Sequence, residues 1–241
     1  MMKPARESVK RADLFWAAFL GCAPEDLSGS RIIVVSPAGR KDSDGAILFR
    51  RDRACIVSVP GSIPHSTREA LCGASIDRVF DPEFLAASFA LERKRIGSPS
   101  WMDVCDPIDF TPVPLSAQLL KPGWKEQLAD RYSHGEWVRS GFFRVPAPSF
   151  GLCQADELIA VSGYFAKDGM ADIRVGMHPS HQGKGYEEAV ISAAVRHAFE
   201  KELIPMVCTE VSDKERIACA RSLGFSPYAM VCGVQVTEPE L

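Results

Sequence analysis

A segment in the second half of the chain combines residue types that can bind phosphate. It runs from a strand through a proline turn and two glycines into a helix, with the sequence Val175-Gly176-Met177-His178-Pro179-Ser180-His181-Gln182-Gly183-Lys184-Gly185-Tyr186. The first amides of a helix lack partners within the helix and carry the positive end of its dipole, so they attract anions. Gly183 and Gly185 allow close backbone approach to an anion, and Lys184 adds a positive charge. The pattern predicts a phosphate-binding loop.

Two common nucleotide-binding loops do not match this segment. It fits neither the Walker sequence nor the dinucleotide fingerprint. It also follows two β-rich runs, 158–166 and 171–177, which the turn Asp168-Gly169 joins as an antiparallel hairpin. Both nucleotide motifs open a parallel unit instead, so the sequence disfavours a nucleotide ligand.

The elements that position the loop follow from the periodicity of the sequence. Residues 185–202 repeat apolar side chains at helical spacing, and 205–211 predict a strand. Ser212-Asp213-Lys214-Glu215 has the form of a capping box for a helix to about 222, and 228–236 predict a last strand. From 158 onward the order is strand, strand, helix, strand, helix, strand.

The earlier part of the chain predicts a smaller α/β region. We expect helices at 9–21, 66–73 and 81–93, and a small meander of three strands at 31–36, 46–50 and 54–59. Four prolines in 96–114 predict a connection, so we place a boundary between domains at 1–113 and 114–241. The second domain is expected to open with a helix at 115–132, broken at Pro122-Gly123, and a strand in the aromatic-rich segment 136–145.

The joint order of elements and motifs resembles the GNAT superfamily of N-acetyltransferases over residues 115–236. In that family the fourth strand ends in a proline-bearing turn followed by Gln/Arg-x-x-Gly-x-Gly/Ala, and Gln182 to Gly185 fit this motif while Glu187 departs from it. A second family signature is an Asn-led helix that ends in Leu-Gly-Phe, which is similar to Asp213 through Leu223-Gly224-Phe225. The resemblance implies a GNAT-like acyl-CoA N-acyltransferase fold of the α/β (α+β) class, with a mixed, mostly antiparallel sheet.

The resemblance also implies acetyl-CoA as co-substrate and a primary amine as acceptor. The pantetheine arm would pair with the backbone of Val175, Gly176 and Met177, and Asp213 occupies the place of a pantetheine-contacting Asn. The alternative for Asp213 is that it only caps its helix. The pyrophosphate would lie against the loop and the first helical turn, formed by Gln182, Gly183, Lys184, Gly185, Tyr186, Glu187 and Glu188.

The acid and base that the family most often uses are missing here. Ala220 stands where the family frequently has a tyrosine, and Cys208 stands in place of its partner glutamate. Glu210 follows Cys208 by two residues and lies on the same face of the predicted strand, so we expect it to be the catalytic base. The alternative is catalysis by proximity alone.

Composition excludes several other classes of function. The chain has 28 basic and 31 acidic side chains and a formal charge of −3, which predicts no nucleic-acid partner. No stretch approaches the roughly 20 apolar residues that span a bilayer, so we expect no membrane partner. Eight cysteines form no C-x-x-C pair and no metal-ligand spacing with the five histidines, which predicts reduced thiols, no metal and a cytoplasmic location.

The sequence thus favours an acyltransferase of the EC 2.3.1 type that acts on an amine. The departures at Glu187 and Ala220 leave open a catalytically silent CoA-binding or sensing module, and a protein-interaction scaffold is a further alternative. For residues 1–113 we consider a substrate-gating lid, a degenerate GNAT-like half or a dimerisation surface, so a homodimer is left open. The aromatic-rich segment 136–145 could line the acceptor site instead of forming an ordinary strand.

Overall fold

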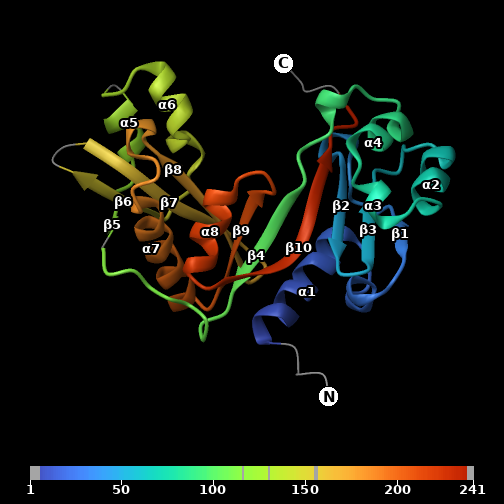
Figure 1. The fold of residues 1–241 in the computed structure, drawn as a ribbon, viewed down its shortest axis with the longest axis horizontal. Coiled ribbons are helices and arrows are strands. Elements are labelled where there is room, and N and C mark those ends of the chain that lie inside the picture. Colours follow the sequence, from blue (N-terminus) through green and yellow to red (C-terminus); the bar gives the residue numbers. More distant parts are fainter. Residues whose placement is uncertain (1–5, 116, 130, 155–156, 238–241) are drawn as a thin grey trace. The chain divides into compact units, whose positions relative to one another are not determined.

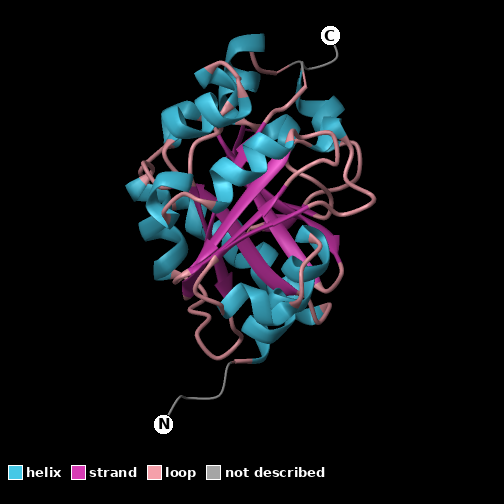
Figure 2. Cartoon of the chain, turned by 90° about the vertical axis from the view of Figure 1, so that its right-hand side faces the viewer, coloured by secondary structure: helices cyan, strands magenta, loops and turns pink. Residues whose placement is uncertain are grey.

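The fold was analysed in a computed structural model that describes residues 6–115, 117–129, 131–154 and 157–237. Helices and strands both contribute extensively, as Figure 2 shows, and this confirms the α+β class. The chain forms two compact units. Unit 1 contains the described residues of Met1–Arg11, Asp103–Cys208 and Asp213–Ser226, and unit 2 contains those of Ala12–Met102, Thr209–Ser212 and Pro227–Leu241.

Unit 1 is built on a mixed, mostly antiparallel sheet with the strand order β9-β8-β7-β6-β5 (Figure 1). Strands β5 to β8 pair antiparallel in succession, and β8 pairs parallel with β9. The strands are β5 (Gln118–Leu119), β6 (Ser149–Gln154), β7 (Glu157–Lys167), β8 (Met170–Met177) and β9 (Ile204–Glu210). The last residues of β9, Thr209 and Glu210, group with unit 2.

Helices α7 (Tyr186–Glu200) and α8 (Lys214–Ser222) supply the apolar core of unit 1 together with this sheet. The helical spacing of the apolar residues in α7 puts Ile191, Ala194 and Val195 on one buried stripe. Fully burying an aliphatic side chain of this size contributes about 1.5–3 kcal/mol, so the stripe fixes α7 against the strands. The start of α7 is therefore held in place after the segment 178–185, which joins it to the end of β8.

The strands of unit 2 lie in the order β1-β3-β2-β10. Strand β1 (Ile32–Val35) pairs parallel with β3 (Ala54–Ser58), and β2 (Ala46–Arg51) pairs antiparallel with both β3 and β10 (Phe225–Val234). Helices α2 (His65–Cys72), α3 (Ile76–Val79) and α4 (Pro82–Phe89) bury Leu71, Val79 and Leu85 in its core. Helix α1 (Glu7–Leu20) begins in unit 1 and continues into unit 2.

The predicted elements from residue 158 onward are confirmed in type and order. In the first half, the expected three-stranded meander is wrong, because β1 pairs in parallel with β3 and not with β2. The helix expected at 81–93 ends at Phe89, where Ala90 adopts a left-handed conformation. The proline-rich stretch 96–114 contains a strand, β4 (Ser100–Cys105), which fits between Pro99 and Pro107.

Two predictions at the start of the second domain are also wrong. The stretch 115–132 holds β5 and the short helix α5 (Trp124–Ala129), with residues 116 and 130 outside the described part of the chain. The segment 136–145 is not a strand but helix α6 (His134–Ser140) followed by η4 (Phe142–Arg144). A capping box decides this, because Ser133 and Glu136 satisfy each other's backbone amides.

The boundary expected at residue 113 stays a prediction. The two compact units of the structure divide the chain at other positions. Strand β10 contributes most of its residues to unit 2, although it follows α8 of unit 1 in sequence. Residues 227–237 are therefore part of the same compact unit as residues 12–102.

The tight packing of Gly163 in β7 generates a first prediction. A Cβ atom at this position would overlap the backbone carbonyl oxygens of Pro146 and Pro148, which cannot move as a flexible side chain could. We expect Gly163→Ala to lower the free energy of unfolding by about 1–3 kcal/mol in urea titration, the usual range for overpacking. Gly233 in β10 has nothing within 4 Å of such a Cβ. Gly233→Ala is the matched control, and equal effects of the two substitutions would contradict the packing argument.

Candidate functional site

Strands β8 and β9 separate before β8 ends. Their parallel pairing joins Met170–Ile173 to Ile204–Val207, and β8 then continues to Met177. On its other side β8 stays paired with β7, since Val175, Gly176 and Met177 face Ser162, Val161 and Ala160, respectively. The last residues of β8 therefore extend past the end of its pairing with β9, so one of their two backbone edges is not paired with β9. An extended ligand can pair with such an edge as an additional strand would.

Gly176 is required by the close packing at this end of β8. A Cβ atom there would lie 2.9 Å from the carbonyl oxygen of Ser140 and 2.9 Å from the Phe142 ring. Phe142 is fully buried in a cluster with Trp124, Val145, Leu158 and Val161. The α6–η4 segment is thus anchored beside the strand end on which the predicted backbone contacts lie.

The predicted phosphate loop has a backbone that requires glycine at two positions. After η5 (Pro179–His181), Gly183 and Gly185 adopt φ values of +71° and +77°, in the left-handed region that other residues avoid. Gly183 has open space around it, with nothing within 4 Å of a Cβ. Gly185 caps α7 without a side-chain hydrogen bond among the described residues. The first amides of α7 are thus left for a ligand or water.

Glu187, the residue that departs from the family motif, is neutralised by a partner from α8. Its Oε1 accepts a hydrogen bond from Arg216 Nε at 2.8 Å, and its side chain is only 18% exposed. Burial raises the pKa of Glu187, and the nearby Arg216 guanidinium lowers it in part. The carboxylate is therefore engaged by an arginine, which reduces the repulsion that an anion at the loop would meet.

Asp213 caps α8. Its Oδ1 accepts a hydrogen bond from the backbone amide of Arg216 at 3.0 Å, and its Oδ2 lies 3.9 Å from Arg216 Nε. The capping role that the sequence left as an alternative is therefore present. Through Arg216, Asp213 joins the same charged group as Glu187, which links the start of α8 to the first turn of α7.

The residues considered for acid and base chemistry lie in different surroundings. Ala220 is buried in the core of unit 1, so this position holds a packing residue in this chain. Cys208 is half-buried, and Glu210 is exposed and accepts a hydrogen bond from Ser212 Oγ at 3.5 Å. Both lie on β9, two residues apart, and so project to one face of the strand.

The structure also brings together a group that the sequence did not predict. Glu157, His178 and His181 each offer one ligand atom, and these atoms lie within 4.8 Å of one another. Glu157 is 21 positions before His178, so only the pairing of β7 with β8 reveals the group. The backbone amide of His178 donates to Ile159 O at 2.8 Å, which continues that pairing past the end of β8.

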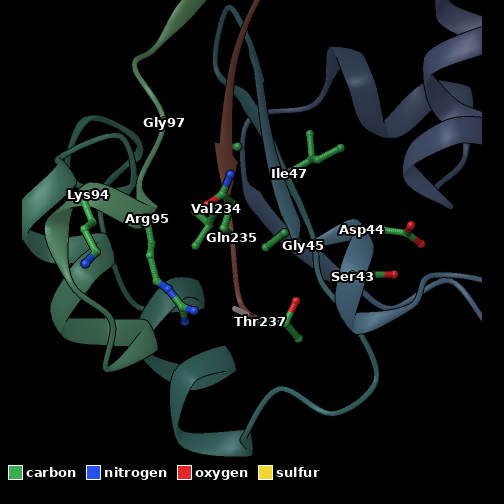
Figure 3. Close-up of a pocket in the computed structure, with 12 residues that line it drawn as sticks. Ser43, Asp44, Gly45, Ile47, Lys94, Arg95, Gly97, Val234, Gln235 and Thr237 are labelled. Carbon is green, nitrogen blue, oxygen red and sulfur yellow. The ribbon is translucent and has the colours of Figure 1, made fainter. Parts of the chain in front are cut away.

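A cavity of about 780 Å³ lies in unit 2, away from every predicted site residue. Figure 3 shows Lys94 and Arg95 on one side of it and Ser43 and Asp44 on the other. Lys94 forms an ion pair with Glu92 at 2.7 Å. The lining thus carries both positive and negative charges. Within the described residues, no helix has the length and apolar character needed to cross a membrane.

Comparisons with known proteins give a family for the second half of the chain. Residues 115–225 match the family model of the acetyltransferase (GNAT) family. Comparison with curated proteins gives no match. Among solved structures, the chain is similar to a GCN5-related N-acetyltransferase from Kribbella flavida, with 16% identity over 90% of this chain and 95% of that one, and a TM-score of 0.48.

Two further solved structures cover a smaller part of the chain. One is a putative acetyltransferase from the GNAT family from Novosphingobium aromaticivorans, with 17% identity, 58% of this chain covered and a TM-score of 0.47. The other is a GNAT-family acetyltransferase from Colwellia psychrerythraea, with 15% identity, the same coverage of this chain and a TM-score of 0.46. The alignments span 64% and 56% of those chains, respectively.

The ion pair between the largely buried Glu187 carboxylate and the half-exposed Arg216 guanidinium predicts a free energy of unfolding that depends on pH. In Arg216→Met the carboxylate loses its partner, so the folded-state pKa of Glu187 rises further above its unfolded value. When the pKa of a carboxyl group is higher in the folded state than in the unfolded state, stability is retained at pH values below the unfolded-state pKa. It is lost as the pH rises through the folded-state pKa. We expect Arg216→Met to lower the free energy of unfolding by about 1–3 kcal/mol at pH 7 and by less at pH 4.

The control for this prediction removes the charge that needs the partner. In the double variant Glu187→Gln/Arg216→Met, the added loss at pH 7 should largely disappear, because a neutral amide does not change its charge between the two pH values. A loss in the single variant that is the same at both pH values would show that Arg216 acts through packing alone.

Proposed function

Because residues 115–225 form a domain of the GNAT acetyltransferase family, we propose that this chain transfers an acetyl group from acetyl-CoA to a primary amine. The single observation that carries the proposal is that the edge of β8 not paired with β9 is followed along the chain by the start of α7, which has no side-chain cap among the described residues. These features offer, in order, backbone groups for an extended arm and amides for an anion. A CoA molecule has both parts, joined in the same order.

The pantetheine arm is proposed to pair with Val175, Gly176 and Met177, beyond the point where the β9 ladder stops. The arm contains two amide groups, and each can exchange hydrogen bonds with a strand edge. The thioester at its end would then lie in the gap between the diverging strands. An acceptor amine in the same gap would be held beside the carbonyl carbon, which contributes several kcal/mol through proximity.

The pyrophosphate is proposed to bind between Gln182 and Glu188. The amides of this segment supply donors, Lys184 is exposed and supplies a mobile charge, and the two glycines keep side chains away from the anion. Arg216 engages Glu187, and its charge also lies at the first turn of α7. Asp213 is proposed to contact the pantetheine arm with an oxygen lone pair that its capping bond does not use.

Glu210 is proposed to accept the proton that the attacking amine releases, directly or through one water molecule. The amine nitrogen forms a bond to the acetyl carbon, the carbon–sulfur bond breaks, and CoA leaves as a thiolate that takes up a proton. Glu210 is exposed and lies on the same strand face as Cys208. With Ala220 buried in the core, that position supplies no acid for the thiolate.

A second candidate function, a CoA-binding or sensing module, is favoured by that missing acid alone. Two measurements on the full chain separate the proposals. The first is the melting temperature during titration with acetyl-CoA, CoA and desulfo-CoA, and the second is turnover on a panel of primary amines. Stabilisation with turnover supports the enzyme, and stabilisation without turnover supports the sensor. A cytoplasmic location is proposed as well, and in the described part of the chain the cysteines form no disulfide bonds.

The loop glycines give a prediction with a matched control. Gly183→Glu and Gly185→Glu each place bulk and negative charge where the pyrophosphate is proposed to bind, so we expect calorimetry to detect no CoA binding. Gly123 also has a positive φ, +82°, and directly precedes a helix of unit 1, α5. Gly123→Glu should carry a similar backbone cost and keep the CoA affinity. A folded Gly185→Glu protein with unchanged CoA affinity would disprove the pyrophosphate site.

The role of Glu210 gives a separate prediction. Glu210→Gln should lower turnover by roughly 10²–10⁴-fold at neutral pH, the usual effect of losing a general base, with little change in acetyl-CoA affinity. A higher pH should restore part of the rate because more of the amine is then neutral. Glu215→Gln, an exposed change in the first turn of α8, serves as the control. A Glu210→Gln enzyme with turnover close to wild type would favour proximity alone.

A further inference from the structure

Three donor groups that the proposed acetyl transfer does not use meet at the end of β8. Glu157 begins β7, His178 directly follows β8, and His181 ends η5. One ligand atom from each lies within 4.8 Å of the others. Two of these donors are ring nitrogens and the third is a carboxylate oxygen. The group therefore combines the donor types that borderline transition-metal ions prefer.

The contacts of His178 leave one ring nitrogen facing the carboxylate. Its Nδ1 lies 2.7 Å from Ser180 Oγ, and its Nε2 lies 3.7 Å from Glu157 Oε1. That separation is longer than a hydrogen bond, so no proton joins the two atoms. The His178 ring is largely buried, whereas the Glu157 side chain is 49% exposed. A fixed nitrogen thus faces a carboxylate that is free to adjust its position.

His181 gives independent support for a ligand site. Its Nδ1 is buried and has no hydrogen-bond partner among the described residues. Buried polar atoms are nearly always partnered, and an unpartnered one calls for an explanation such as binding to an ion. The ring centroid of His181 lies 5.8 Å from that of His178 and 5.9 Å from that of Tyr186.

We propose that Glu157, His178 and His181 bind one divalent transition-metal ion, with Zn²⁺ as the best fit. Two histidines and one carboxylate form a known Zn²⁺ ligand set that leaves a fourth position for water or another ligand. Tetrahedral Zn²⁺ with bonds of about 2.0–2.2 Å holds its ligand atoms about 3.3 Å apart. The 3.7 Å pair is close to this value, and the exposed Glu157 side chain can bring its oxygen closer to the histidine nitrogens, which themselves lie within 4.8 Å of each other.

This proposal replaces the expectation of no metal that the spacing of cysteines and histidines suggested. That reasoning compared positions close in sequence, whereas the carboxylate ligand comes from the neighbouring strand. The ion would connect the start of β7 to the segment between β8 and Gly183. Binding to the native state alone raises the free energy of unfolding, so the ion should stabilise this end of the sheet.

The test uses the full chain, freed of metal with a chelator and then titrated with Zn²⁺ in a calorimeter. We expect one ion per chain. Glu157→Gln, His178→Gln and His181→Gln should each weaken Zn²⁺ binding by on the order of 100-fold or more. The loss of a residue that only supports a ligand costs about 10–100-fold, and the loss of a direct ligand should cost at least the upper end of that range. Co²⁺ in place of Zn²⁺ should give the visible absorption of a four-coordinate ion in the wild-type chain and lose it in each variant.

The control is the exposed pair His65 and Glu69, which also puts an imidazole nitrogen near a carboxylate, at 3.3 Å. His65→Gln should leave Zn²⁺ affinity and the Co²⁺ spectrum unchanged. Glu157→Gln removes a half-exposed charge without changing shape, so this variant should fold and keep the test decisive. Zn²⁺ binding that is equal in wild type and Glu157→Gln, or no binding by the wild-type chain, would overturn the proposal. Neither result depends on acetyl-CoA.

Discussion

The divergence of β8 from β9 is the constraint on which the candidate site depends. Backbone amides and carbonyls must find partners, and a strand inside a sheet finds them in its neighbours. Here the parallel ladder stops at Ile173 and Val207 while β8 continues to Met177. After η5 and the glycine loop, the buried stripe of α7 fixes the position of the helix start. A polar strand edge and a set of helix amides are thereby placed in succession.

Charge at this helix start is controlled by contacts across unit 1. Glu187 would oppose an anion if it stood alone, but the half-exposed Arg216 of α8 forms an ion pair with its largely buried carboxylate. Asp213 caps α8 and also lies near Arg216, so the two helices share one charged group. The departure from the family motif at Glu187 is therefore compensated by a residue that belongs to no loop motif.

The proposed metal group lies on the approach to the same loop and follows from a different kind of contact. His178 is held at the end of β8 by its bond to Ile159, and this puts its ring beside the first residue of β7. The hairpin of β7 and β8 thus has its polar, ligand-rich end next to the glycine loop, and its tight turn at Asp168-Gly169 at the opposite end. A single hairpin supports both proposed functions.

Local sequence patterns were enough to predict the α+β class, the order of elements from residue 158 onward, the glycine loop, and the resemblance of the second half of the chain to the GNAT family. These follow from local effects: apolar periodicity, a hairpin turn, a capping box and glycines that tolerate positive φ, each acting within a few residues. Local patterns did not predict the parallel pairing of β1 with β3, the strand β4 between prolines, the partner of Glu187 or the contact of Glu157 with His178. Those features join residues distant in sequence, and their formation depends on packing that no local pattern records.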